Sequence, residues 1–223
     1  MAMADWTPVN RARTSTWLAE AAARRWVSLI LAAACVTVDR LIPWQGMSFT
    51  ARAMIDEPCH IANALVVLGA ITRFRGYAPA QEFCWSMLAC SVLIDIDHLP
   101  LEFGSSILTA GTPRPYTHAL WVVAVLITAT LLARWQSRRS GGSASAGAVP
   151  ILAGAAWGVS AHFLRDVSTA NMSLWWPLTD AHVEMPYWCY VVALLLIVAF
   201  PLTRSRKIVV LELKPSERAV RLP

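Results

Sequence analysis

Six apolar segments, separated by polar linkers, constrain this chain more than any other feature of its sequence. They cover residues 26–43, 59–72, 83–101, 117–133, 149–165 and 187–202. About 20 apolar residues form an α-helix that spans a bilayer. Several segments are shorter, so we expect a turn of mixed polarity to extend each of them. The sequence predicts an all-α, polytopic membrane bundle of about six transmembrane helices over residues 26–203, with cytoplasmic segments at 1–25 and 204–223.

Composition supports a membrane protein and argues against other classes. Only 15% of the residues are charged and 57% are hydrophobic, whereas soluble domains carry about 25% charged residues. The net charge of +5 is spread over short loops and tails, which indicates cytoplasmic loops rather than a surface that binds nucleic acid. The five cysteines form no CxxC pair, so we predict core residues and neither a disulfide framework nor a thiolate metal site.

The distribution of Lys and Arg predicts the orientation of the bundle in the inner membrane. With the N-terminus in the cytoplasm, fifteen of the nineteen basic residues fall on the inner side. Four fall on the outer side: Arg40, Arg52, Arg114 and Arg165. Cytoplasmic loops of membrane proteins are enriched in such residues. Six helices then place both termini in the cytoplasm.

Ionisable residues gather on the outer half of this predicted bundle. All five histidines and nine of the fourteen acidic residues lie there. At 1.5 Å per residue, His60 and Asp95 lie roughly 18 Å from the inner ends of their helices, His162 roughly 20 Å and His118 roughly 24 Å. Four helices thus place ligand-type side chains in one layer, below the outer edge of a hydrocarbon core about 30 Å thick.

The spacing of these residues favours one shared metal centre. Three pairs lie on common helix faces at intervals of three or four residues: Asp56 with His60, Asp95 with His98, and His162 with Asp166. A single intramembrane His or Asp is often only a hydrogen bond between helices. A cluster of acids at this depth needs compensation, from a divalent cation, protonation, or Arg114 and Arg165. Imidazole and carboxylate ligands suit Zn²⁺ or Mn²⁺, and we expect a metal for the cluster as a whole.

Three short runs and a later tripeptide occur in a distinctive order. They are Leu93-Ile94-Asp95-Ile96-Asp97-His98-Leu99-Pro100, Arg114-Pro115-Tyr116-Thr117-His118, His162-Phe163-Leu164-Arg165-Asp166 and Trp175-Trp176-Pro177. This order resembles the YdjM-like membrane-bound metal-dependent hydrolases, whose pattern is an early His, DxDH, R-G-x-T-H-S, and HxxxD followed by T…WP. The resemblance covers about residues 60–177 and implies a metal-dependent hydrolase. Pro115 and Tyr116 replace the usual glycine-containing dipeptide, and Ala119 replaces the serine.

The candidate metal ligands are seven residues of the cluster: His60, Asp95, Asp97, His98, His118, His162 and Asp166. Seven exceed the needs of one tetrahedral ion, so two ions about 3.5–4 Å apart form the sharper hypothesis. Zn²⁺ is favoured, with Mn or Fe as alternatives. Asp97 is a ligand or a bridge, and it is also a catalytic candidate.

Other polar residues near the cluster are candidates for catalysis or substrate binding. Asp56, one turn from His60, is a candidate general base or a partner of a ligand, or else it caps the second helix together with Glu57. Arg114 and Arg165 are candidate substrate-binding groups, because a guanidinium fork matches a phosphate. The alternative for Arg114 is a membrane-interface anchor.

Three further polar positions have simpler expectations. Asp39 is expected to form an ion pair with its neighbour Arg40. Thr117 either orients the ring of His118 or caps a helix. His182, on the last outer loop, is expected to be exposed.

The leading functional hypothesis is a metal-dependent hydrolase at the outer membrane boundary. Its substrate would be an amphiphilic ester or phosphoester, such as a phospholipid or polyprenyl phosphate, so its partner is a membrane lipid and not nucleic acid. The alternative is a non-catalytic divalent-metal carrier, sensor or scaffold. A carrier needs a polar path to both faces, whereas residues 120–132 and 191–200 are almost wholly apolar. A membrane di-iron lipid oxidase ranks lowest, because the chain has only five histidines.

Overall fold

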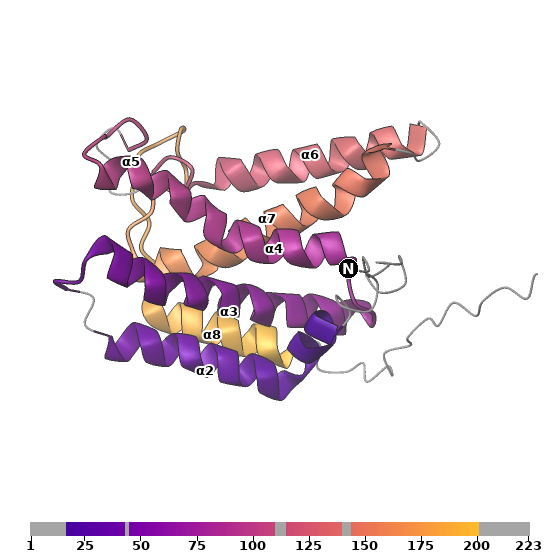
Figure 1. Ribbon diagram of the computed structural model, residues 1–223, viewed down its shortest axis with the longest axis horizontal. Coiled ribbons are helices and arrows are strands. Elements are labelled where there is room, and N and C mark those ends of the chain that lie inside the picture. The colour runs from indigo at the N-terminus through magenta and orange to yellow at the C-terminus, as the bar shows by residue number, and fades with distance from the viewer. Residues whose placement is uncertain (1–16, 43–44, 110–114, 140–143, 201–223) are drawn as a thin grey trace, which may run out of the picture.

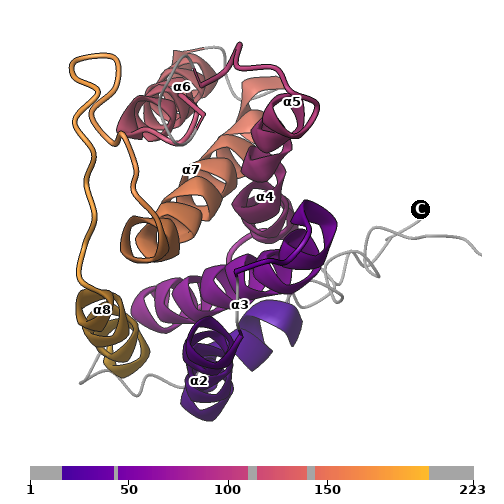
Figure 2. The same cartoon turned by 90° about the vertical axis from the view of Figure 1, so that its left-hand side faces the viewer.

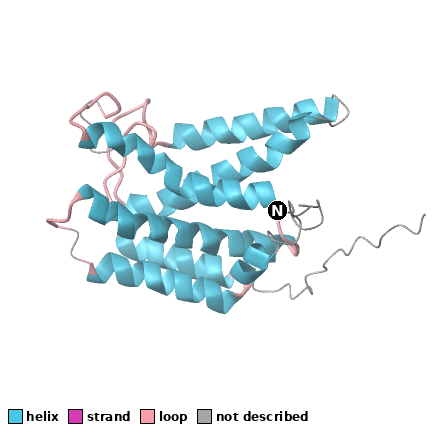
Figure 3. Cartoon of the chain, viewed as in Figure 1, coloured by secondary structure: helices cyan, strands magenta, loops and turns pink. Residues whose placement is uncertain are grey.

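The computed structural model describes residues 17–42, 45–109, 115–139 and 144–200. Helices dominate this part of the chain, and no strand forms within it (Figure 3). In chain order they are α2 (Arg25–Leu41), α3 (Phe49–Arg75), α4 (Gln81–Leu93), the 3₁₀-helix η1 (Ile94–His98), α5 (Leu99–Glu102), α6 (Leu120–Arg139), α7 (Ala144–Thr169) and α8 (Tyr187–Ala199). The all-α prediction is confirmed. The predicted tail and Arg114 lie outside the described residues.

The helices form two layers that run roughly along the long axis of the molecule. One layer holds α2, α3 and α8, and the other holds α4, α6 and α7 (Figures 1 and 2). Helix α7 packs against α4 and α6, whereas α3 contacts α2, α4, α7 and α8. The most buried of the four long helices are therefore α3 and α7, and the least buried is α6. These two central helices provide His60, His162 and Asp166.

Glycines permit a close helix contact in the bundle, between α4 and α7. Gly154 and Gly158 form a GxxxG pair on α7. A Cβ at Gly154 would meet the carbonyl of Phe83, and one at Gly158 would meet the carbonyl of Met87. Small residues let membrane helices approach this closely, because packing rather than the hydrophobic effect holds them together in lipid. The α4–α7 pair is thus fixed by backbone contact.

Each of the six apolar segments corresponds to a helix, and several helices are longer than the segments. Helix α3 begins ten residues before the predicted segment, because Ser48 caps it by accepting a hydrogen bond from Ala51 N–H at 3.3 Å. Gly76, at φ 74°, ends it. Asp56 and Glu57 consequently lie inside the helix, so their predicted alternative role as caps is wrong.

Four helices in the described residues are long and apolar enough to cross a membrane. A fifth span results if Trp17–Ala23 and α2, which meet at 78°, count as one. Helix α8 is apolar but has only 13 residues. Large apolar side chains are exposed along α6, among them Val125, Leu131 and Leu132, as expected for a surface in contact with lipid. The described residues therefore hold four or five candidate spans, whereas about six were predicted for the chain.

Candidate metal centre

The predicted ligands meet beside η1, which leads directly into α5 at one end of the bundle in Figure 1. His60 comes from α3, and His162 and Asp166 come from α7, where their four-residue interval puts them on one face. Asp95 and His98 come from η1, whose three-residue turn aligns residues three apart. His118 precedes α6. Distant parts of the chain thus converge on one buried cluster.

Four residues form the tightest group of possible ligands. Asp95, His118, His162 and Asp166 each offer one ligand atom, and these atoms all lie within 4.8 Å of one another. His118 Nε2 lies 3.0 Å from Asp95 Oδ1, and His162 Nε2 lies 3.1 Å from Asp166 Oδ2 and 3.6 Å from Asp95 Oδ1. All but Asp95 are buried. Two nitrogens and two carboxylates around a small volume can hold a divalent ion.

A second group shares two members with the first. It consists of Asp95, Asp97, His98 and His118. His98 Nε2 lies 3.5 Å from Asp95 Oδ1 and 3.9 Å from Asp97 Oδ1. This group is less buried than the first, since only His118 is fully buried. Together the two groups hold six of the seven predicted ligands.

The other ring nitrogens of His118 and His162 are also engaged. His118 Nδ1 lies 3.1 Å from Asp97 Oδ2, which also accepts a hydrogen bond from the Thr117 hydroxyl. His162 Nδ1 lies 2.9 Å from the carbonyl oxygen of Ser91. Metal-binding histidines usually donate their second N–H to a carboxylate or carbonyl, which fixes the ring and the tautomer. Both rings therefore direct Nε2 into the first group.

His60 is the seventh predicted ligand, and it lies at the edge of the cluster. Its ring stacks on His162 with centroids 3.7 Å apart. Its Nε2 lies 3.1 Å from Arg165 Nη1, nearer than Asp166 Oδ1 at 3.5 Å or Asp95 Oδ2 at 3.9 Å. It belongs to neither four-residue group.

Arg165 is buried in an ion-pair network beside His60. Its Nη2 lies 2.6 Å from Asp39 Oδ1, and its Nη1 lies 2.5 Å from Asp56 Oδ1. Tyr187 donates a hydrogen bond to Asp39 Oδ2 at 2.9 Å. The predicted substrate-binding guanidinium is only 2% exposed, so in this structure its partners are protein carboxylates. Asp56, a predicted base, is likewise held by a cation.

The expected pairing of Asp39 with Arg40 is wrong. Asp39 binds Arg165, whereas the guanidinium of Arg40 lies over the ring of Tyr187, 4.0 Å from its centroid. Adjacent residues on a helix point in different directions, so two neighbours rarely pair. An acid in an apolar helix indicates a buried partner, but adjacency in the sequence pointed to Arg40 instead of Arg165.

Sequence reasoning missed two groups that support the ligands. One is the Ser91 carbonyl, a backbone atom that no residue type reveals. The other is Asn63, which is fully buried one turn after His60 and donates its side-chain N–H to the carbonyl of Ala161. Its i,i+3 relation to His60 was a signal for the same helix face. His182 is exposed, as expected, and its Nδ1 contacts Ser173 Oγ at 3.1 Å.

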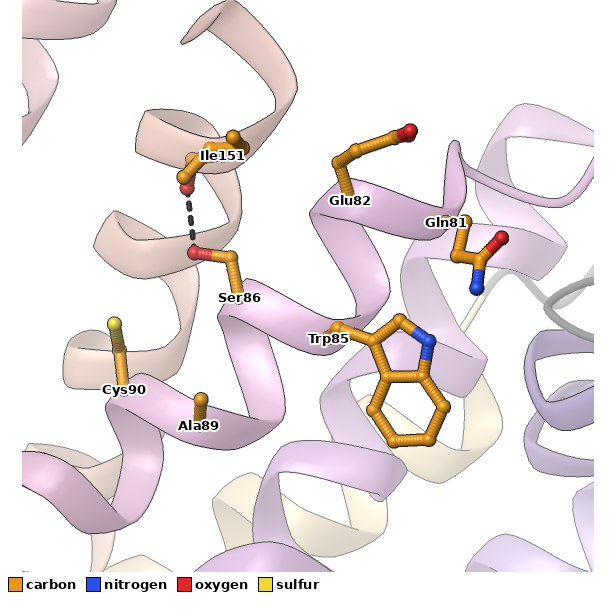
Figure 4. A pocket seen from close by; sticks show the side chains of 7 residues that line it. All are labelled: Gln81, Glu82, Trp85, Ser86, Ala89, Cys90 and Ile151. Carbon is orange, nitrogen blue, oxygen red and sulfur yellow. Dashed lines mark hydrogen bonds between the residues drawn. The ribbon is translucent and has the colours of Figure 1, made fainter. Parts of the chain in front are cut away.

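Two pockets lie apart from the candidate ligands. One is a shallow groove between α4 and α7, where Ser86 Oγ donates a hydrogen bond to the carbonyl of Ile151 at 2.7 Å (Figure 4). The other is an apolar groove between α3, α7 and α8 that includes Phe74, Trp157 and Leu196. None of the seven predicted ligands lines either pocket.

Residues 54–218 match the family described as YdjM inner membrane protein, which is most of the chain. The chain belongs to the YdjM inner membrane protein family. The predicted family and the multi-pass inner-membrane location are thereby confirmed. The YdjM match begins within α3, so it includes both ligand groups, whereas Asp39 on α2 precedes it. No curated protein and no solved structure matches the chain.

The donor set of this YdjM protein fits a divalent metal. Within the described residues, the ion-pair contacts of Asp95 and Asp97 are all with histidines. Nitrogen and oxygen donors without thiolates suit Zn²⁺, Mn²⁺ or Fe²⁺. The site can therefore hold a metal ion.

Proposed function

We propose that this protein is a metal-dependent membrane hydrolase that cleaves an amphiphilic ester or phosphoester at the extracytoplasmic side. The observation that supports it best is the convergence of Asp95, His118, His162 and Asp166, with ligand atoms within 4.8 Å of one another. Zn²⁺ is the preferred ion, because it accepts this mixture of imidazole and carboxylate ligands.

A bound divalent ion would supply Lewis acidity, which activates a water molecule and stabilises developing negative charge. The chain's own residues prepare the ligands for that role. Ser91 orients His162, and Asp97 orients His118. His60 and Arg165 close the cluster on the side of α2 and α3. These contacts hold the nitrogen donors in place before an ion binds, as preorganisation requires.

The cluster is partly open on the side of η1. The side chains of Asp95, Asp97 and His98 are 14%, 9% and 17% exposed, whereas those of His118 and His162 are fully buried. A substrate would approach this partly exposed edge. Since the edge terminates membrane helices, an amphiphile is favoured over a soluble metabolite, and the partner is a membrane lipid or lipid-linked molecule.

The proton acceptor we favour is Asp97. Asp56 is held by Arg165 at 2.5 Å, and a nearby cation weakens a carboxylate as a base. Asp97 uses Oδ2 for Thr117 and His118, while its Oδ1 is buried without a hydrogen-bond partner among the described residues. That oxygen is placed to accept a proton within the second group.

The proposal is tested on protein purified without chelator. Metal content per chain is measured by elemental analysis, and hydrolysis is measured on phospholipids and polyprenyl phosphates. We expect at least one divalent ion per chain and hydrolysis of at least one lipid. His162→Ala and Asp166→Ala should lose both ion and activity, while the exposed-loop variant His182→Ala keeps both. Folding of each variant is followed by circular dichroism.

Two outcomes would contradict this proposal in different ways. A folded wild-type protein without metal would refute the metal centre. A metal-loaded protein that cleaves no lipid in a broad panel would favour a non-catalytic metal-binding protein, such as a sensor or scaffold.

A further inference from the structure

Arg165 is the largest fully buried side chain in the described part of the chain. Its guanidinium lies between helices: Asp39 is on α2, and Asp56 and His60 are on α3. Burying a cation is costly unless it is paired and hydrogen-bonded. Here two carboxylates and one imidazole nitrogen surround it, at 2.6, 2.5 and 3.1 Å.

These three partners are the same types of donor as those of the first ligand group. Asp39 and Asp56 offer carboxylate oxygens, and His60 offers a ring nitrogen. Such a set binds divalent metals when no other cation occupies it. The guanidinium therefore occupies a position that would otherwise suit a metal ion.

The guanidinium of Arg165 and a metal ion would compete for one atom in particular, Nε2 of His60. Arg165 has only N–H donors, so its contact with His60 Nε2 requires that nitrogen to accept with its lone pair. A metal ion would need the same lone pair. Nε2 cannot serve both, so Arg165 keeps His60 out of the metal centre as long as the guanidinium stays.

Asp166 links the two halves of the cluster. Its Oδ2 lies 3.1 Å from His162 Nε2, in the first ligand group, and its Oδ1 lies 3.5 Å from His60 Nε2. A carboxylate in this position can bridge two cations. The cation on the His60 side is the one that the chain itself provides, on the residue next to Asp166.

We propose that Arg165 is a resident cation in a second cation site formed by Asp39, Asp56 and His60, and that it confines bound metal to the Asp95 side of the cluster. This inference rests on the proposed metal centre. It assigns Arg165 a role in setting the number of ions, rather than in binding substrate. Asp39, outside the YdjM match, is then needed to hold that cation in place.

The decisive variant is Arg165→Met, which removes the charge while keeping a long side chain. Wild-type and variant proteins are equilibrated at the same free Zn²⁺ or Mn²⁺ concentration, and ions per chain are counted by elemental analysis. We expect Arg165→Met to bind one more ion per chain than wild type. The added ion should bind more weakly in Arg165→Met/Asp56→Asn, and Arg165→Lys, which keeps the charge, should match wild type.

A purely structural arginine would give a different pattern. In that case Arg165→Met would lower the unfolding temperature without gaining an ion, and added metal would not restore it beyond its effect on wild type. If the inference holds, divalent metal raises the unfolding temperature of Arg165→Met more than that of wild type.

Arg165→Met leaves two buried acids without their cation and can therefore fail to fold. Arg165→Met/Asp39→Asn removes one acid together with the guanidinium and keeps Asp56, His60 and Asp166. We expect this double variant to bind the added ion at a higher free metal concentration. A folded double variant with wild-type stoichiometry up to saturation overturns the inference. The proposed function would stand in that case, since it fails only if wild type itself binds no metal.

Discussion

The Nδ1 atom of His162 lies 2.9 Å from the carbonyl oxygen of Ser91, and this contact decides where the ring proton resides. A carbonyl can only accept, so Nδ1 must donate, and Nε2 is the nitrogen that faces Asp95 and Asp166 and is available to a metal ion. His162 is thus prepared as a ligand by a backbone group. No side-chain substitution of Ser91 removes that group directly.

The support of His118 by a side chain is easier to test. Loss of such a partner usually lowers metal affinity about 10- to 100-fold, so we expect Asp97→Asn to show an effect of that size. Thr117→Val removes only a hydrogen bond to Asp97 and should have a smaller effect. Affinity is measured by competition with a fluorescent chelator. Thr130→Val, in α6, is the control, and equal affinity in all three variants would contradict the assignment.

The two carboxylates that hold Arg165 should contribute unequally to stability. The side chain of Asp39 is 3% exposed and that of Asp56 is 33% exposed. Breaking a buried pair costs up to about 3–5 kcal/mol, whereas partly solvated pairs contribute about 1 kcal/mol or less. We therefore expect Asp39→Asn to lower the free energy of unfolding in detergent more than Asp56→Asn. Asp180→Asn, in an exposed loop, controls for the substitution type, and the reverse order would show that burial does not govern this network.

The close contact between α4 and α7 should couple packing to metal binding. Gly158→Leu would drive a side chain into the carbonyl of Met87. Overpacking of this kind costs about 1–3 kcal/mol, and it should also weaken metal binding by displacing α4 from α7. Gly147→Ala is the matched control, because a Cβ there meets nothing within 4 Å. Thermal unfolding and metal affinity are measured together. A less stable Gly158→Leu protein with unchanged affinity would show that the two properties are independent.

The predicted orientation also has a direct test. Fifteen of nineteen basic residues lie on the predicted inner side, so reporter fusions at the C-terminus and in the loop between α7 and α8 should give opposite results. We expect a cytoplasmic C-terminus and an extracytoplasmic loop. Fusions that report the same side would exclude this topology.

The sequence predicted the helices and the meeting of the ligands because both depend on simple periodicities. Apolar length identified each helix. A common depth brought His118 and His162 together with Asp95, although they are far apart in the chain. Depth along a helix axis follows from residue counting alone, and helices that cross one membrane share that coordinate.

Residue counting does not reveal how each helix is rotated, and the incorrect predictions follow from that limit. Asp39, on α2, faces Arg165, which lies more than a hundred residues later in the chain, whereas Arg40 faces Tyr187. The Lys and Arg count placed Arg165 at an outer helix end without showing that it points inward. The polar extension of α3 was predicted, but it is longer than the expected single turn, because Ser48 caps the helix.

Gly154, Gly158 and His162 follow one another on α7 at intervals of four residues. Their partners on α4 keep the same interval: Phe83, Met87 and Ser91. The contacts at Gly154 and Gly158 are backbone contacts that only glycine allows. The contact at His162 is the hydrogen bond that places a ring proton on Nδ1. A slip of one residue would move the third carbonyl by about 1.5 Å along the axis and about 100° around it. The register between α4 and α7 thus determines which nitrogen of His162 can reach a metal, although the ligand residues stay the same.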